Sequence, residues 1–279
     1  MTKKPKNWYE TVTIRPVINV DGYERYEKVC NYVANIFFSV DAPKLRQKLI
    51  TNSKESINIT LYTLYKVGEA KCPAYWVSDE LLTALMQSEL SVEVDNLHWA
   101  MKTGIFMLPK GRVASLEGRS IDAIFWHYEA ADDFLCLAAT DGGSFFCRKF
   151  TVNDNLSKFT YTDAEDYNPQ VITEFNEYLQ TIFLRLILIM ECRPELVEKE
   201  AQIFKLNKGF AKDKAKDFYK PLWLGRNYCI KRDVQDKGGT HASPRVHWRK
   251  GFLRSQPHGQ GRQQRKLVWI EPVLVMGRA

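Results

Sequence analysis

The chain has 279 residues, of which 45% are hydrophobic and 13% aromatic, enough to bury the core of one large domain or two ordinary ones. No apolar run reaches the roughly 20 residues that a membrane span needs, and the basic N-terminus is followed by no apolar export signal. These features argue against a membrane or exported protein, so we expect a cytoplasmic location and no membrane partner.

The formal net charge of +7 is unevenly distributed. Residues 205–279 carry 18 Lys and Arg against 5 Asp and Glu, whereas the rest of the chain carries 22 against 28. Such an imbalance indicates a surface for nucleic acid, an anionic membrane or an acidic partner. The six cysteines are scattered without a pair at zinc-ligand spacing, and we expect neither a metal nor a cofactor.

The first third of the chain predicts a mixture of strands and one helix. Residues 8–40 cluster in a β manner around an Asp21-Gly22 hairpin turn. Residues 41–50 predict a helix with Asp41 as its N-cap. The stretch INITLYTLYKV, residues 57–67, alternates apolar and polar side chains and predicts a strand.

The middle of the chain predicts two helices around a group of strands. Residues 78–90 have the apolar spacing of an amphipathic helix, with Ser78 as its cap. Residues 104–130 predict strand, turn and strand, and residues 134–152 predict two strands joined by the turn residues 141–143. Residues 168–192 predict one long helix, which ends at Arg193-Pro194.

The fold class predicted by these elements is α+β, with a mostly antiparallel sheet, packed helices and a basic C-terminal β element. We expect three regions: an α+β body at residues 1–200, a lysine-rich linker or arm at residues 201–225, and a basic β tail at residues 226–279 that packs on the body. Strand-like pieces at residues 227–234, 244–256 and 266–275 make up the tail.

Residues 240–266 contain many basic side chains and no carboxylate. Strand alternation places His247 and Arg249 on one face, where an imidazole could move a proton and a guanidinium could hold phosphate. His247 and Arg249, together with His241, are therefore the candidate catalytic residues for metal-independent RNA cleavage. The candidate nucleic-acid-binding residues are Arg245, Trp248, Lys250, Arg254, Arg262, Arg265 and Lys266.

The segment from Ser243 to Val275 resembles a tail found in bacterial and phage-encoded proteins, of the form His-x-Arg-Arg-Gly-His-x-Arg followed by a loop and a Trp-containing strand. The residues that match are His247, Arg249, Gly251, Arg254, Trp269 and Pro272. Lys250 replaces an arginine of the pattern, and Phe252 stands where the pattern has its second histidine. The resemblance covers about an eighth of the chain and implies a prokaryotic or phage setting; it implies no particular reaction.

Several functions fit these observations. The first is a protein that binds RNA or DNA, with RNA favoured, through its basic tail, and acts as a ribonuclease-type toxin, a toxin–antitoxin component or a phage-defence component. The alternative is a non-enzymatic repressor or inhibitor that docks on an acidic or RNA-bearing partner. A third is a nucleotide-modifying transferase.

Outside the tail, His127 and Glu129 share one face of a predicted strand, where a packed and hydrogen-bonded histidine is the commoner arrangement. The sequence leaves open whether the protein is an enzyme.

Overall fold

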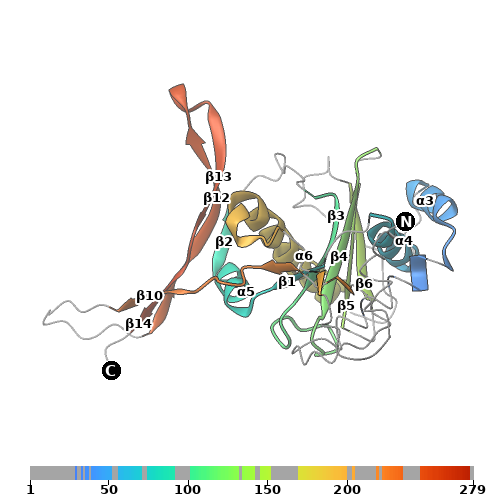
Figure 1. Ribbon diagram of the computed structural model, residues 1–279, viewed down its shortest axis with the longest axis horizontal. Helices are drawn as coiled ribbons and strands as arrows, with labels where there is room; N and C mark the ends of the chain where they lie inside the picture. Colours follow the sequence, from blue (N-terminus) through green and yellow to red (C-terminus); the bar gives the residue numbers. More distant parts are fainter. Residues whose placement is uncertain are drawn as a thin grey trace, which may run out of the picture. The chain divides into compact units, whose positions relative to one another are not determined.

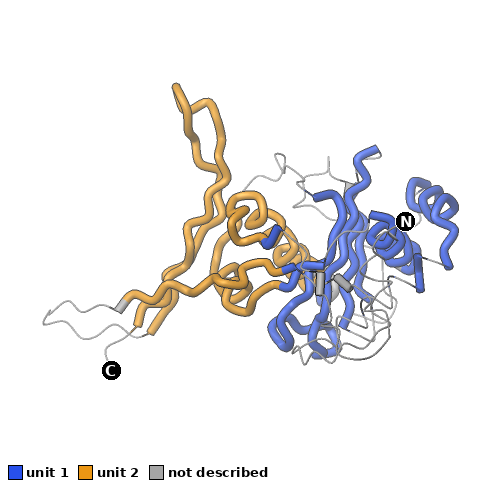
Figure 2. The backbone as a smooth tube through the Cα atoms, viewed as in Figure 1, with its two compact units in different colours: residues 1–76, 101–173, 198–222 blue, residues 77–100, 174–197, 223–279 orange. Residues whose placement is uncertain are grey.

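A computed structural model describes residues 29, 33, 35–37, 39–51, 56–70, 74–91, 101–131, 134–141, 145–151, 169–199, 203–204, 218–219, 222–234 and 246–276. The chain forms two compact units, each assembled from segments that are far apart in the sequence (Figure 2). The first unit comprises residues 1–76, 101–173 and 198–222, and the second comprises residues 77–100, 174–197 and 223–279. The expected boundaries at residues 200 and 226 stay predictions.

The largest sheet has six strands in the order β6-β5-β4-β3-β1-β9 (Figure 1). Strands β3 to β6 are antiparallel neighbours, and β1 pairs with β3 in parallel. The strands of this sheet are β1 (Ala74–Val77), β3 (Thr103–Met107), β4 (Ala123–Glu129), β5 (Phe134–Thr140), β6 (Phe145–Thr151) and β9 (Leu222–Leu224). The two strand pairs predicted within residues 104–152 are therefore confirmed, because β3 pairs with β4 and β5 pairs with β6.

Two helices of the first unit, α3 (Ala42–Ile50) and α4 (Ser56–Ala70), lie against each other, and α4 contacts strands β3 to β6. The predicted N-cap of α3 is confirmed, since the Asp41 side chain accepts a hydrogen bond from the Lys44 backbone N–H. Apolar side chains of α4 and of the sheet, such as Leu64, Val67 and Phe125, share one buried cluster. The helix therefore closes one face of the sheet and completes the core of this unit.

The strand predicted at residues 57–67 is wrong, because these residues belong to helix α4. Ile57, Ile59 and Leu61 suggested alternation, but Ile57 is 63% exposed while Asn58 and Thr60 are buried. A period of 3.6 residues brings Ile59 and Tyr62 onto one buried face, which a period of two cannot do. The β character expected for residues 8–40 fails where it can be checked, since residues 29, 33, 35–37 and 39 are helical; the Asp21-Gly22 turn lies outside the described residues.

The two other predicted helices are confirmed as α5 (Asp79–Met86) and α6 (Pro169–Cys192). Ser78 caps α5, because its side chain accepts a hydrogen bond from the Leu81 backbone N–H. Helix α5 ends earlier than residue 90, and residues 88–91 form strand β2 (Ser88–Ser91). Leu186 on α6 is fully buried, and seven of the ten residues from 181 to 190 are buried. Among the described residues, no helix has both the length and the apolar character needed to cross a membrane.

The second unit contains two three-stranded sheets, with the orders β10-β14-β11 and β13-β12-β2. Their remaining strands are β10 (Lys231–Val234), β11 (His247–Arg249), β12 (Gly251–His258), β13 (Gln264–Ile270) and β14 (Val273–Met276). The expected basic C-terminal β element is confirmed, although each of the last two predicted strands is split in two. With helices and mostly antiparallel sheets, the fold is α+β, as predicted. Two short strands, β7 (Ile203–Phe204) and β8 (Phe218–Tyr219), pair with each other within the region expected to be a linker.

Candidate functional site

Strands β12 and β13 form a long antiparallel hairpin, here called the arm and defined as residues 251–270 (Figure 1). At the root of the arm, Leu253 lies opposite Trp269 in the strand register, and the two side chains are 0% and 6% exposed. The Trp269 Nε1–H donates a hydrogen bond of 3.0 Å to the Ser88 Oγ. Because β2 pairs with β12 in parallel, this bond joins the two outer strands of the sheet. The root is thereby fastened to the rest of the second unit.

Gly251 sits at the break between β11 and β12, where another backbone approaches closely. A Cβ atom at this position would lie 2.6 Å from the Ile270 carbonyl oxygen, 2.6 Å from the Ser88 Oγ and 2.7 Å from the Pro272 Cδ. Only glycine fits there without displacing neighbouring atoms. The Gly251 N–H donates to the Gln87 carbonyl oxygen at 3.0 Å, so this residue sets the point from which the arm leaves the unit.

A cluster of charged and aromatic side chains surrounds the end of β13. Arg193 binds Glu271 with an Nη1–Oε1 distance of 2.7 Å, and its guanidinium lies 5.8 Å from the centre of the Trp269 ring. Lys231 approaches the other Glu271 oxygen at 3.4 Å. The ring of Tyr228 packs on Trp269 with a centroid separation of 5.4 Å. Glu271, only 12% exposed at its side chain, is therefore held by two cations beside the arm root.

Beyond the root, the arm is open to solvent on every side. All thirteen residues from 254 to 266, here called the distal arm, are exposed. The distal arm carries four cations and four glutamines and no Asp or Glu. Its cations are Arg254, Arg262, Arg265 and Lys266. The tip turns through Gly259, Gly261 and Arg262, which all have positive φ values of 78°, 67° and 56°.

One pair of large apolar side chains is exposed near the arm root. Phe252 and Ile270 lie directly opposite each other in the strand register and are 36% and 39% exposed. Alternation along the strands directs Leu253 and Trp269 to the buried face and leaves Phe252 and Ile270 on the other. An exposed cross-strand pair of this size is a candidate contact for another macromolecule.

The structure places the predicted catalytic residues in a different sheet from the arm. His247 and Arg249 lie in β11, opposite Val275 and Val273 of β14, and both are exposed. They share one face of the strand, as predicted, while Trp248 between them is half-buried. The Arg249 guanidinium approaches Asp233 of the neighbouring β10 at 3.5 Å.

The remaining predicted residues divide into three groups. His241 and Arg245 lie outside the described residues. Lys250 forms an ion pair with Glu89 at 2.7 Å, so its charge already has a partner within the protein. The four cations of the distal arm show no ion pair with any described residue. The structure therefore separates the predicted basic surface into cations near the root that form ion pairs and cations on the distal arm that form none with the described residues.

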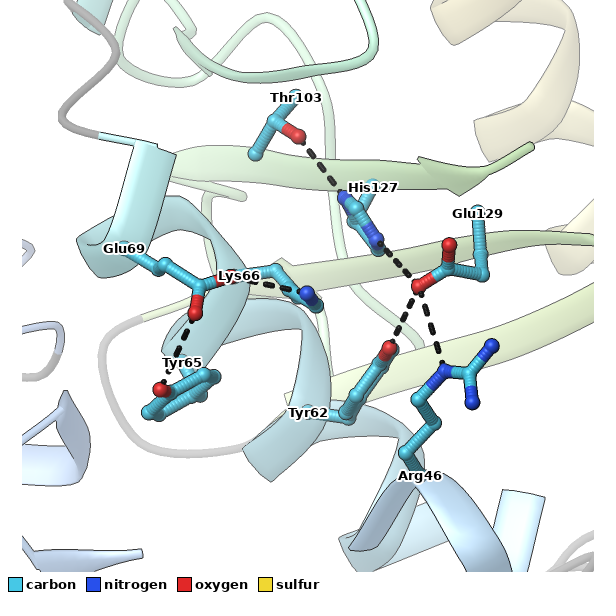
Figure 3. A network of polar contacts seen from close by, with 8 residues as sticks. All are labelled: Arg46, Tyr62, Tyr65, Lys66, Glu69, Thr103, His127 and Glu129. Atoms are coloured by element: carbon cyan, nitrogen blue, oxygen red, sulfur yellow. Dashed lines mark hydrogen bonds and ion pairs between the residues drawn. The ribbon is translucent and has the colours of Figure 1, made fainter. Parts of the chain in front are cut away.

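A second polar cluster lies in the first unit, around His127 and Glu129 on β4 (Figure 3). The Thr103 Oγ1 lies 2.8 Å from the His127 Nδ1, and the Tyr62 hydroxyl donates a 2.8 Å hydrogen bond to Glu129. The His127 Nε2 faces the same Glu129 oxygen at 3.5 Å, and the Arg46 Nε lies 3.7 Å from it. Burial, and after it the charge of nearby Lys66, lowers the pKa of His127 to about 4.

This cluster joins α3 and α4 to strands β3 and β4, and its histidine is 8% exposed. A buried neutral imidazole that is hydrogen-bonded to Thr103 has the character of a structural group, as the sequence suggested for His127. Among the described residues, no group of three or more His, Cys, Asp or Glu side chains could hold a metal ion. The exposed arm of the second unit is therefore the candidate functional site.

Residues 75–277 match the AcrVA2-like family, described as anti-CRISPR type V subtype A2. The match covers more than two thirds of the chain and includes the complete arm. The chain belongs to this anti-CRISPR family. No curated protein and no solved structure matches it.

Membership in an anti-CRISPR family corrects three interpretations of the sequence. The interpretations of this chain as a ribonuclease-type toxin, a toxin–antitoxin component or a phage-defence component are wrong. An anti-CRISPR protein counteracts bacterial immunity against phage. The basic run from residue 240 to 266 suggested RNA cleavage, because clustered cations resemble a phosphate-binding site. Clustered cations indicate electrostatic attraction to anions, but they are not evidence for a catalysed reaction. The alternative, an inhibitor that docks on a partner, agrees better with the family.

Sequence reasoning missed the residues that hold and flank the arm. Three residues, Ser88, Glu89 and Arg193, contact the arm or the residues at its root from positions 78 to 181 residues earlier in the chain. No local pattern reveals such pairings. Phe252 carried a signal, since it replaces a histidine of the pattern that the tail resembles, but its exposure became evident only with the strand register.

Proposed function

We propose that this protein inhibits type V CRISPR immunity by binding a protein component of the system, without catalysing a reaction. The observation that supports the proposal is the family match over residues 75–277. The absence of common nucleotide-binding and hydrolase motifs from the sequence agrees with a binding role. The tail's resemblance to phage-encoded proteins supports the same setting.

The contact with the protein component involves Phe252 and Ile270 at the arm root. Protein interfaces concentrate their binding energy in a few aromatic and apolar anchors surrounded by polar residues. Phe252 and Ile270 have this character, because they are exposed, adjacent and flanked along β12 by Arg254. The buried face behind them, with Leu253 and Trp269, keeps the strand backbone in place and reduces the ordering cost of binding.

The test uses phage infection of bacteria that carry a type V CRISPR system with a guide against the phage. Expression of the protein should restore plaque formation by several orders of magnitude, and it should have no effect on bacteria protected by a type I system. Unchanged protection of the type V strain would contradict the proposal. His247→Gln should retain the inhibition, since a binder requires no proton transfer at that side chain.

A second measurement identifies the contact surface. The double variant Phe252→Ser/Ile270→Ser should lose both inhibition and the type V protein that co-purifies with the tagged chain. The matched control is Ile57→Ser, which removes an apolar side chain that is 63% exposed on α4 of the first unit. Equal inhibition by the double variant and the control would show that the contact lies elsewhere.

A further inference from the structure

We infer that the distal arm is a DNA-binding ribbon that enters the major groove of a double helix. The inference goes beyond the proposed function and is carried by a different observation, the distribution of charge over residues 254–266. It concerns a different macromolecule and different residues from the protein contact at Phe252 and Ile270.

The four cations of the distal arm point in more than one direction. In the register of the hairpin, Arg254 and Lys266 lie on one face of the ribbon, opposite Val268 and Gln256. Arg265 lies opposite Pro257 and belongs to the other face. Arg262 is in the turn at the tip. A partner that contacts one flat face would leave part of this charge unpaired, whereas a groove surrounds the ribbon on both sides and at its tip.

The composition of the distal arm is that of a nucleic-acid interface. Such interfaces are more polar and much more positively charged than contacts between proteins, which need apolar anchors at their centre. Residues 254–266 offer no large apolar side chain, and Pro257 is their only apolar residue apart from two glycines. Arginine and glutamine side chains can donate to phosphates and can also bind the edges of guanine and adenine in the major groove.

The dimensions of the ribbon also fit a major groove. Two paired strands lie about 4.8 Å apart, and the four residue steps from Arg254 to His258 span about 14 Å. The major groove of B-form DNA is about 12 Å wide and admits a two-stranded ribbon, whereas the major groove of double-stranded RNA is deep and narrow. The ribbon geometry therefore favours duplex DNA over the RNA that the sequence favoured.

Because the distal arm is fully exposed, contact with DNA would offset the free-energy cost of holding it extended. Ordering a residue costs about 1–2 kcal/mol of conformational entropy, and thirteen exposed residues bury little apolar surface to offset it. The root supplies the anchor, through Leu253, Trp269 and the Nε1–Oγ hydrogen bond to Ser88. Phosphate contacts would release counterions from DNA and would stabilise the extended ribbon.

The test measures fluorescence anisotropy of labelled 20-base-pair DNA with the purified full-length protein, without any CRISPR component. With four phosphate contacts, log K should fall against log salt with a slope of about −3.6, which is a loss of about 10²-fold in affinity between 50 and 200 mM salt. The variant Arg254→Ser/Arg262→Ser/Arg265→Ser/Lys266→Ser should lose this binding and its salt dependence.

The matched control removes the same charge elsewhere. Lys48, Lys102, Lys110 and Lys199 are exposed and lie in the first unit, and their joint replacement by Ser should leave DNA binding within a few-fold of wild type. Circular dichroism and thermal unfolding confirm that both quadruple variants are folded. Equal losses in the two variants, or no DNA binding by the wild-type protein at 50 mM salt, would overturn the inference.

Three further probes decide which partner the arm prefers. Binding to double-stranded RNA, to single-stranded RNA and to polyglutamate should each be weaker than binding to duplex DNA of the same length. Tighter binding to either RNA would overturn the major-groove geometry, and tighter binding to polyglutamate would show that the arm docks on an acidic protein. Because these probes contain no CRISPR component, their failure leaves the proposed function intact, and failure of the plaque assay leaves DNA binding intact.

Discussion

At the scale of single residues, His127 couples stability to pH. Its folded pKa of about 4 lies below the ordinary 6.5, because burial disfavours the charged imidazole. As the pH falls from 6.5 to 4, the unfolded chain binds a proton that the folded protein does not. The stabilisation by neutral His127 is therefore complete above pH 6.5 and is lost progressively towards pH 4.

We predict that the free energy of unfolding decreases by up to about 1.4 kcal/mol per pH unit over this window on account of His127. Urea unfolding at pH 7, 6 and 5 measures the slope. His127→Gln retains a polar side chain that can bond to Thr103 but cannot titrate in this range, and it should show a flatter dependence. Identical slopes in the two proteins would contradict the role of His127.

A second prediction at the scale of single residues concerns the hydrogen bond between Trp269 and Ser88. Ser88 is 2% exposed, so Ser88→Ala leaves the indole N–H buried without an acceptor and should cost about 1–3 kcal/mol. In a Trp269→Phe background no donor remains, and the same substitution should cost less. Urea unfolding of the two single variants and the double variant gives the coupling free energy. A coupling of zero would mean that the bond does not stabilise the arm root.

At the scale of elements, the packing of α6 can be tested along its length. Leu186 is fully buried and Val171, near the start of the same helix, is 45% exposed. Leu186→Ala should destabilise the protein by about 2–5 kcal/mol, because it leaves a cavity, whereas Val171→Ala should change stability by about 0.5 kcal/mol or less. Thermal and urea unfolding compare the two variants. A near-neutral Leu186→Ala would show that the helix core can collapse around the cavity.

Helices α4 and α5 illustrate which elements local sequence predicts. Ser78 and the two acids that follow it mark the start of α5 in the sequence, because capping depends on residues that are adjacent in the chain. The β-branched residues of α4 and its apolar residues at positions 57, 59 and 61 instead imitate a strand. Packing of Leu64 and Val67 with Phe125 and other residues of the sheet selects the helical period.

At the scale of the whole molecule, the distal arm should be dispensable for folding. Replacing residues 256–266 by Asn-Gly joins Ser255 to Leu267, which are paired in the hairpin, through a two-residue turn. Since every removed residue is exposed, the free energy of unfolding should change by less than about 1 kcal/mol. Urea unfolding measures stability, and anisotropy should show that DNA binding is lost. A large loss of stability would mean that the arm contributes to the fold.

The sequence by itself determined the α+β class, the caps of α3 and α5, the extent of α6 and the basic character of the C-terminal region. These properties depend on neighbouring residues or on composition, and both can be read along the chain. It also included Arg254, Arg262, Arg265 and Lys266 among the seven candidate nucleic-acid-binding residues, since charge does not depend on register.

Only the tertiary structure decided which of the basic residues are exposed and which of them form ion pairs with the described part of the chain. Lys250 and Glu89 are 161 residues apart in the chain, and Arg193 and Glu271 are 78 apart. Pairing over such separations depends on strand register and on which segments join a unit, and a shift of one residue moves every side chain to the opposite face. The exposed pair of Phe252 and Ile270 and the two-sided charge of the distal arm both arise from that register.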